Sequence, residues 1–269
     1  KLPDHRAFIL RKRLSQRRRA VREIFKKSIL ILAIFVIWQV VCELEIFTPY
    51  ILPSPLATLK TMYSMSLSGE LATHTIISFK RIFAGYALSF ALALVLGGIA
   101  ALLPKISVYY EWILEFFRNI PPLSLIAILV LWFGINETPK IIIIILASFF
   151  PMFLSIQKGL TSCDIKLIEV GKIFGFSKFE IFYKIILKSA LKDIFVGMRI
   201  GFGYAMRAII GAEMIAASSG LGYLILDAEE LSRADRIFVG IFTIGICGVL
   251  IDRIFLLLIA KFSLLRGEK

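Results

Sequence analysis

Charged side chains embedded in long apolar stretches are the groups of this sequence that could bind a solute. Six of them fall at or within such stretches: Arg118, Arg199, Arg207, Glu213, Asp252 and Arg253. A charge at the centre of a bilayer costs at least about 2.5–3.5 kcal/mol on insertion scales, so such residues usually face other protein or a water-filled cavity. The pattern predicts ion pairs between helices or an aqueous path for a solute, and both remain open.

The spacing of these charges limits which of them can pair. Arg199 and Glu213 are fourteen positions apart, which places them on nearly the same helix face but about 21 Å apart along the axis. Arg207 and Glu213 are six apart and point to different faces. Each therefore needs a partner on another helix or a substrate. For Arg207, one hypothesis is that it lines a path for a small anion; the alternative is an interhelical ion pair or a snorkelling side chain.

Covalent and metal chemistry find no support in the sequence. The only histidines are His5 and His74, and Cys42, Cys163 and Cys247 lack the paired spacing of a metal site or disulfide framework. The chain has no Gly-x-Ser-x-Gly, no His-Glu-x-x-His and no phosphate-binding Gly-x-x-x-x-Gly-Lys-Ser/Thr. We therefore expect no catalytic residue, no metal and no cofactor in this chain. If ATP drives its action, another subunit must bind it.

The elements that position these charges are long apolar segments. The sequence is 58% hydrophobic and 19% charged, with a mean hydropathy of +0.84, whereas soluble domains carry about 25% charged residues. About 20 apolar residues are needed to cross a bilayer as a helix. The composition predicts an all-α polytopic membrane protein with about six spans, at 28–47, 82–103, 112–133, 140–160, 194–217 and 237–260.

Charge asymmetry orients these spans. The first 27 residues hold eleven Lys or Arg against Asp4 and Glu23, so the positive-inside rule places them in the cytoplasm. Six crossings return the C-terminus to the same side. Lys80 and Arg81 are basic residues at the outer edge of the second span, and they are the main exception to this charge asymmetry. The predicted division of the chain is a basic segment 1–27, retained in the protein, a transmembrane domain 28–262 and a cytoplasmic tail 263–269.

The net charge of +13 has two readings. A basic arm could bind nucleic acid, but no stacking aromatic residues or nucleic-acid fold accompany it. Membrane orientation and attraction to anionic lipids of the inner leaflet explain the same charge. We expect membrane lipid as a partner and no nucleic acid.

The loop 164–188 interrupts the apolar segments with an organised polar sequence. Residues 164–174 form an amphipathic pattern, Gly175 can end a helix in the left-handed region, and Ser177 with Glu180 matches a capping box for a second short helix. This arrangement predicts two short helices joined by a glycine turn. Such a unit could dock on a soluble partner, or it could be an ordinary connection whose apolar face lies on the membrane.

This loop also carries a family resemblance. Glu169 precedes Gly175 by six positions, which resembles the "EAA…G" signature of ABC-importer permeases, with Gly171, Phe176 and Ser177 inside the matching segment. Further matches, in order, are Leu52-Pro53-Ser54-Pro55, Gly69-Glu70-Leu71, His74, Ser78, Arg81, Gly85, Arg118-Asn119-Ile120-Pro121-Pro122, Trp132-Phe133-Gly134, Lys140, Gly197-Met198-Arg199, Ala212-Glu213-Met214, Gly220-Leu221-Gly222-Tyr223 and Asp235. From about residue 52 to 251, the chain resembles permeases of the nitrate/sulfonate/taurine class, which also includes bicarbonate and thiamine-precursor members.

The resemblance implies a type I ABC-importer permease fold and a non-catalytic transport subunit of a bacterial inner membrane. It implies a homodimeric pore, two partner ATPase subunits that bind ATP and Mg and grip the coupling loop, and a periplasmic or lipid-anchored binding protein. The implied coupling residues are Glu169, Gly171, Gly175, Phe176 and Ser177; Arg118, Arg199, Arg207 and Glu213 are the candidates for the substrate path.

Several alternatives remain open at this stage. The expected solute is a small anion such as a sulfonate, taurine or nitrate, and a thiamine-type pyrimidine precursor or bicarbonate is the alternative within the family. An ATP-independent secondary transporter would explain the spans without explaining the coupling loop, and it would leave the lack of an inverted repeat unexplained. A membrane-embedded enzyme lacks a nucleophile–base pair or metal set.

The sequence also departs from the family. Relatives commonly have prolines where this chain has Leu187-Lys188 and Lys192; because proline breaks or kinks a helix, a more continuous helix should enter the fifth span. Arg199 and Glu213 match family positions, whereas Arg207 does not.

Overall fold

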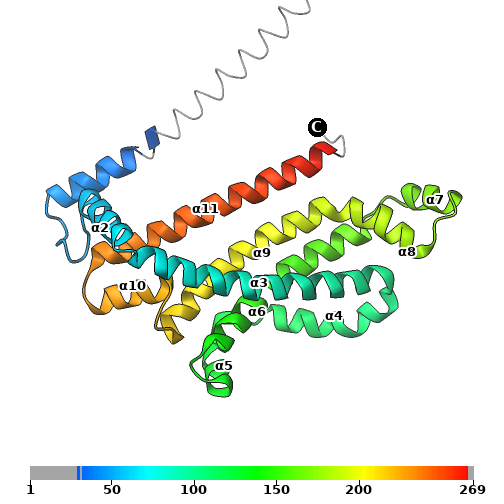
Figure 1. Cartoon of the computed structure of the whole chain (residues 1–269), viewed down its shortest axis with the longest axis horizontal. Coiled ribbons are helices and arrows are strands. Elements are labelled where there is room, and N and C mark those ends of the chain that lie inside the picture. The colour runs from blue at the N-terminus through cyan, green and yellow to red at the C-terminus, as the bar shows by residue number, and fades with distance from the viewer. Residues whose placement is uncertain (1–28, 31, 266–269) are drawn as a thin grey trace, which may run out of the picture.

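The computed structural model describes residues 29–30 and 32–265, and every element in that part of the chain is helical (Figure 1). The predicted basic segment 1–27 and residues 266–269 of the predicted tail lie outside the described residues. A short helix, Leu32–Glu43, comes first. The elements that follow are α2 (Pro55–Leu67), α3 (Glu70–Leu102), α4 (Pro104–Arg118), η1 (Pro122–Leu125), α5 (Ile126–Phe133), α6 (Glu137–Thr161), α7 (Ile165–Ile173), α8 (Lys178–Ile181), η2 (Phe182–Ile186), α9 (Leu187–Ala216), α10 (Leu221–Glu230) and α11 (Ala234–Leu265).

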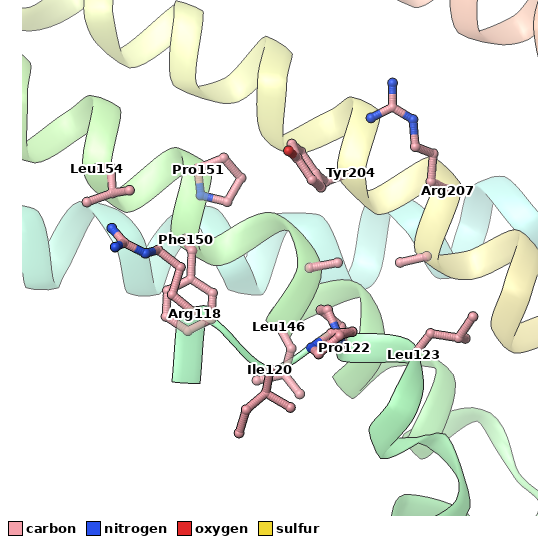
Figure 2. Close-up of a pocket in the computed structure, with 13 residues that line it drawn as sticks. Arg118, Ile120, Pro122, Leu123, Leu146, Phe150, Pro151, Leu154, Tyr204 and Arg207 are labelled. Carbon is pink, nitrogen blue, oxygen red and sulfur yellow. The ribbon is translucent and has the colours of Figure 1, made fainter. Parts of the chain in front are cut away.

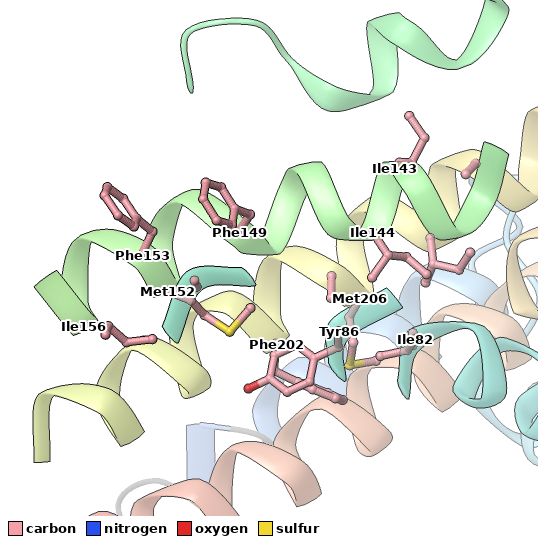
Figure 3. Packing of buried hydrophobic residues seen from close by; sticks show 14 of the residues in the cluster. Ile82, Tyr86, Ile143, Ile144, Phe149, Met152, Phe153, Ile156, Phe202 and Met206 are labelled. Carbon is pink, nitrogen blue, oxygen red and sulfur yellow. The ribbon is translucent and has the colours of Figure 1, made fainter. Parts of the chain in front are cut away.

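The core is built around α6, which packs most extensively against α3 and α9. Figure 3 shows its apolar face meeting Ile82 of α3 and Phe202 of α9. Lipid tails are as apolar as these side chains, so close packing rather than escape from water must hold the helices together. Gly85 and Gly201 permit that closeness, because a Cβ there would lie 2.8 Å from the Ile144 side chain and 2.6 Å from the Met152 side chain, respectively.

Four helices of the described chain are long and apolar enough to cross a membrane: α3, α6, the helix Lys178–Ala216, and α11 from Ala234 to Lys261. They correspond to the predicted second, fourth, fifth and sixth spans. The second begins at Glu70 instead of residue 82. For the predicted first span, the described helix Leu32–Glu43 is apolar but falls among the shorter helices.

The predicted third span, 112–133, needs correction. It consists of two helices, Val108–Arg118 and Pro122–Phe133, that meet at 84°. Proline lacks a backbone N–H, and it pushes the residue before it out of the helical region. Pro121, with an extended backbone at ψ 121°, therefore ends one helix, and Pro122 starts the next.

The continuous helix expected at the fifth span is confirmed. It runs from Lys178 to Ala216 and includes the π-helical turn η2. Figure 1 shows α7 and α8 at one end of the molecule and α10 at the other, with α9 running between them. The start of α8 is therefore joined to the α10 end by uninterrupted helix.

Candidate functional site

Glu213 lies at the centre of a buried group of polar side chains near α10. Its side chain is fully buried. The carboxylate accepts hydrogen bonds from Arg81 Nη1 at 2.9 Å, from Ser78 Oγ at 2.8 Å and from the backbone N–H of Gly222 at 3.0 Å. A buried carboxylate requires this number of partners, because an unpaired one would be driven to protonate. The fold therefore stabilises Glu213 with partners from α3 and α10.

The backbone around Gly220 is shaped to the same carboxylate. Gly220 has φ +118°, and a Cβ there would lie 2.3 Å from Glu213 Cδ. The N–H of Leu221 donates to Ser78 Oγ at 2.8 Å. Glu213 and Ser78 thus satisfy two of the N–H groups that the first turn of α10 leaves free, and the carboxylate lies at the positive end of that helix.

Arg81 extends this group of residues toward α6. It donates to Glu137 through Nε at 2.5 Å and Nη2 at 2.8 Å, and to the carbonyl oxygen of Ser219 at 2.6 Å. Lys140 Nζ contacts Glu137 Oε1 at 3.0 Å. We call Ser78, Arg81, Glu137, Lys140, Glu213 and Ser219 the buried charge network, although Glu137 reaches in from the surface with 56% of its side chain exposed. Within it, the positive charges of Arg81 and Lys140 balance the negative charges of two glutamates, Glu137 and Glu213.

Sequence reasoning did not predict this network. Arg81 appeared there only as an exception to the charge asymmetry and as a family match, and Lys140 only as a match. The structure explains the exception: Arg81 lies within α3 and its charge is neutralised by Glu137 and Glu213. Glu137, at the first position of α6, had no signal beyond being an acid before an apolar run.

Arg199 also has a partner on another helix. Its guanidinium binds Asp252 of α11, with Nε–Oδ1 at 2.5 Å and Nη2–Oδ2 at 3.0 Å. Both side chains are partly exposed. Of the two alternatives left open for Arg199 and Glu213, the geometry supplies ion pairs between helices; their assignment to the substrate path stays a prediction.

Arg118 and Arg207, in contrast, line one cavity of about 450 Å³. Figure 2 shows Tyr204 and Arg207 projecting from α9, Arg118 from the end of α4, and Phe150 and Pro151 on α6. Arg118 pairs with Glu115 at 3.3 Å, and both side chains are well exposed. Arg207 lies over the ring of Tyr204, 5.6 Å from its centroid. No ion pair of Arg207 occurs in the described part of the chain.

The loop 164–188 has the predicted local structure. Asp164 caps α7 by accepting the N–H of Lys166 at 2.9 Å. Gly175 follows α7 with φ +75°. Ser177 and Glu180 form the capping box at the start of α8. Lys184 and the amide and hydroxyl of Ser177 lower the pKa of the Glu180 carboxyl to about 2. The prediction of two short helices joined by a glycine turn is confirmed.

Packing within this loop separates its predicted coupling residues into two kinds. Gly171 is buried, and a Cβ there would lie 2.6 Å from Ile185 Cδ1. Phe176 is half-buried, and the Nζ atom of Lys184 lies 4.6 Å from the centroid of its ring. Both therefore hold the loop together. Glu169, Gly175 and Ser177 are exposed.

The loop also exposes three large apolar side chains. Ile173 is 83% exposed, Phe174 73% and Phe179 76%. We call these three residues the exposed loop patch. Large apolar side chains that gather on a surface are typical of sites that contact protein or membrane.

Metal ligands do not gather in the part of the chain that the structure describes: no group of three or more His, Cys, Asp or Glu residues there could hold an ion. Cys42, Cys163 and Cys247 are free.

Comparison with known proteins places this arrangement in a family. Residues 93–264 match the family "Binding-protein-dependent transport system inner membrane component". The chain is 33% identical to the putative aliphatic sulfonates transport permease protein SsuC of Bacillus subtilis (strain 168), over 93% of this chain and 90% of that protein. It is 31% identical to the taurine transport system permease protein TauC of Escherichia coli (strain K12), over 80% of each.

A solved structure confirms the fold. The crystal structure of an amino acid ABC transporter with histidines contains a chain that superposes with a TM-score of 0.58 at 17% identity, covering 75% of this chain and 97% of the other. At that identity the similarity concerns the fold alone.

Proposed function

This chain belongs to the family of inner membrane components of binding-protein-dependent transport systems, as an ABC-importer permease of the sulfonate/taurine/nitrate class, and we propose that two copies form the translocation path for a small oxyanion. An aliphatic sulfonate is the solute named for a similar permease. A binding protein delivers the anion, and two partner ATPase subunits hydrolyse ATP with Mg. The chain itself performs no covalent chemistry.

The exposed loop patch is the observation that supports docking of the ATPases on this chain. Ile173, Phe174 and Phe179 are solvent-exposed on helices that Gly171 and the capping box hold rigid. Three large apolar side chains on a preorganised unit are what a protein interface uses as anchors. A loop that merely rested on lipid would not need a closed glycine turn and an internally packed glycine.

The continuous helix from Lys178 to Ala216 suggests how docking moves the path. A displacement of α8 passes through the π-helical turn η2 into α9, because no proline interrupts the helix between them. Arg207, which lines the cavity, and Glu213, which holds α10, lie on that same helix. In the proposed cycle, closure of the ATPases tilts α9 and changes access to the cavity.

The orientation of the chain is part of the proposal. The α7–α8 end faces the cytoplasm and its ATPases, and both chain termini lie on that side. The α10 end faces the binding protein. The six lysines of residues 161–193 support this orientation through the positive-inside rule.

Co-purification tests the proposal. The chain is expressed with a candidate P-loop ATPase encoded near its gene, extracted in mild detergent and weighed by native mass spectrometry. We expect a complex of two permeases and two ATPases, lost in Glu169→Ala and in Gly175→Val. Glu229→Ala, an exposed acid on α10, is the matched control and should leave the complex intact.

The opposite result is equally specific. A chain that purifies without the ATPase, yet moves solute into liposomes without ATP, would overturn the proposal in favour of a secondary transporter.

A further inference from the structure

Arg207 is a cation without a counter-ion in the part of the chain that the structure describes. It lies within the apolar helix Lys178–Ala216, it is exposed, and its contact there is with the ring of Tyr204. Arg199, two turns away on the same helix, is neutralised by Asp252. An unneutralised guanidinium within a membrane span is costly, so an anion or water must reach Arg207.

The walls of the cavity beside Arg207 narrow the choice of anion. Leu123, Leu146, Phe150 and Leu154 line it, and no acidic side chain occurs among the described lining residues. Its volume of about 450 Å³ falls in the range of small-molecule sites. An apolar wall gains nothing from a bare inorganic ion, but it stabilises a hydrocarbon body.

The net charge of the residues that line the cavity favours an anion with one negative charge. Arg118, the other cation of the cavity, is bound by Glu115 at 3.3 Å. Among the described lining residues, one uncompensated positive charge therefore remains, that of Arg207. The planar guanidinium offers paired N–H donors that match an oxyanion such as a sulfonate or carboxylate group.

Arg207 also lines a second cavity of about 840 Å³ between α9 and α11, together with Gly203, Gly245 and Gly248. A Cβ at Gly203 or Gly245 would meet nothing within 4 Å, so the packing of a single chain does not require these glycines. One guanidinium therefore borders both cavities, and the acid that lines the second, Asp252, is paired with Arg199.

We propose that Arg207 and the apolar walls around it form a binding site for monoanions with an apolar body, so that the permease itself discriminates against inorganic oxyanions and zwitterions. This inference rests on the proposed function, because it assumes that the cavity belongs to the translocation path. It makes Arg207, which departs from the family pattern, the residue that determines specificity.

The test measures binding to the permease–ATPase complex in the absence of any binding protein, so that only this chain can select. Radiolabelled hexanesulfonate is the probe, and hexan-1-ol, sodium nitrate and taurine are the competitors. We expect hexanesulfonate to bind at least tenfold more tightly than each competitor. Arg207→Gln should weaken it at least tenfold, and Arg207→Lys should restore part of the loss.

Two further variants separate the roles of charge and wall. Lys60→Gln removes an exposed cation of α2 that lines neither cavity, and it should leave binding of hexanesulfonate unchanged. Leu154→Asn makes the wall polar; it should weaken hexanesulfonate several-fold while leaving nitrate unchanged. Native mass spectrometry of each variant shows whether the complex remains assembled.

The inference is overturned if an assembled complex fails to bind hexanesulfonate, binds nitrate equally well, or binds hexanesulfonate equally well with Gln at position 207. Failure of the proposed function gives a different result, namely a permease that never associates with the ATPase. In that case the same binding measurements on the permease alone still decide whether the site exists.

Discussion

The end of the molecule that carries α10 contains charges that are both buried and paired, whereas the end that carries α7 and α8 exposes large apolar side chains. At the first end, Glu213 is fully buried and Arg81 is 6% exposed, and each is bound by partners on other helices. At the second end, Ile173 and Phe174 are more than two-thirds exposed. A single chain thus satisfies the buried charge network by itself, but it leaves the exposed loop patch uncovered.

This difference separates folding from association. A substitution in the buried charge network removes a partner of a buried ion, so it should be felt in the stability of the permease alone. A substitution in the exposed loop patch removes a group that touches little within the chain, so it should be felt only when the partner is present. Variants at the two ends test this separation, beginning with the largest effect.

Glu213→Ala should have the largest effect on stability. It leaves the guanidinium of Arg81 and the hydroxyl of Ser78 in a buried site without their acceptor, and removing one member of a buried ion pair costs about 3–5 kcal/mol. We expect the midpoint of thermal unfolding to fall. Size-exclusion chromatography in detergent, after heating to a series of temperatures, measures this midpoint. Glu229→Ala, on exposed surface, should leave the midpoint unchanged. Equal midpoints for the two variants would contradict the assignment of Glu213 to a structural network.

Phe174→Ser should reverse this pattern. The side chain is 73% exposed, so the free energy of unfolding of the isolated permease should change by less than about 0.5 kcal/mol. Loss of an interface anchor costs about 2 kcal/mol or more of binding free energy. We therefore expect the affinity for the ATPase to be about thirtyfold weaker. Biolayer interferometry on nanodisc-embedded permease measures this affinity. Leu56→Ser, 73% exposed on α2, is the control. An unchanged affinity for Phe174→Ser would exclude the patch as the docking surface.

The two ends also differ in how far the sequence predicted them. The loop was predicted because its determinants are local: Ser177 and Glu180 are three residues apart, and Gly175 follows directly on an amphipathic segment. Local hydrogen bonds of this kind leave a pattern that is recognisable in the sequence itself. The absence of proline at Lys188 and Lys192 likewise predicted the continuous helix correctly.

The buried charge network depends on contacts that no local pattern contains. Ser78 and Glu213 are separated by 135 positions, and Arg81 and Glu137 by 56. Helical periodicity showed that Glu213 needs a partner from elsewhere, but it could not identify Arg81. The 84° bend before α5 was missed for a different reason, since hydropathy over 112–133 outweighed the two prolines in its middle.

Gly175→Val should disturb the loop without disturbing the bundle. Gly175 has φ +75°, and a Cβ there would meet no atom within 4 Å, so the penalty is one of backbone conformation alone, about 1–2 kcal/mol and more for a β-branched residue. We expect faster hydrogen exchange in α7 and α8 and loss of ATP-driven uptake, with the unfolding midpoint unchanged. Gly175→Asn is the control, because asparagine tolerates the left-handed region. Similar exchange in the two variants would exclude this conformational explanation.

The smallest effect is expected at Glu180, and it gives the clearest contrast with Glu213. Both are glutamates that accept a backbone N–H at a helix start and contact a cation, but Glu180 is solvent-accessible. The hydrogen bonds from Lys184 and then from Ser177 lower the pKa of the Glu180 carboxyl to about 2. Because the folded-state pKa lies below the ordinary value, the stabilisation of α8 is present above about pH 4.5 and is lost as the pH falls toward 2.

Amide exchange of residues 178–181 should therefore accelerate, relative to residues 165–173, only within that acid range, and Glu180→Gln should abolish this difference. If Glu180→Gln instead lowered the unfolding midpoint of the whole permease at neutral pH, the loop would be part of the stability core, and the separation between folding at one end and association at the other would fail.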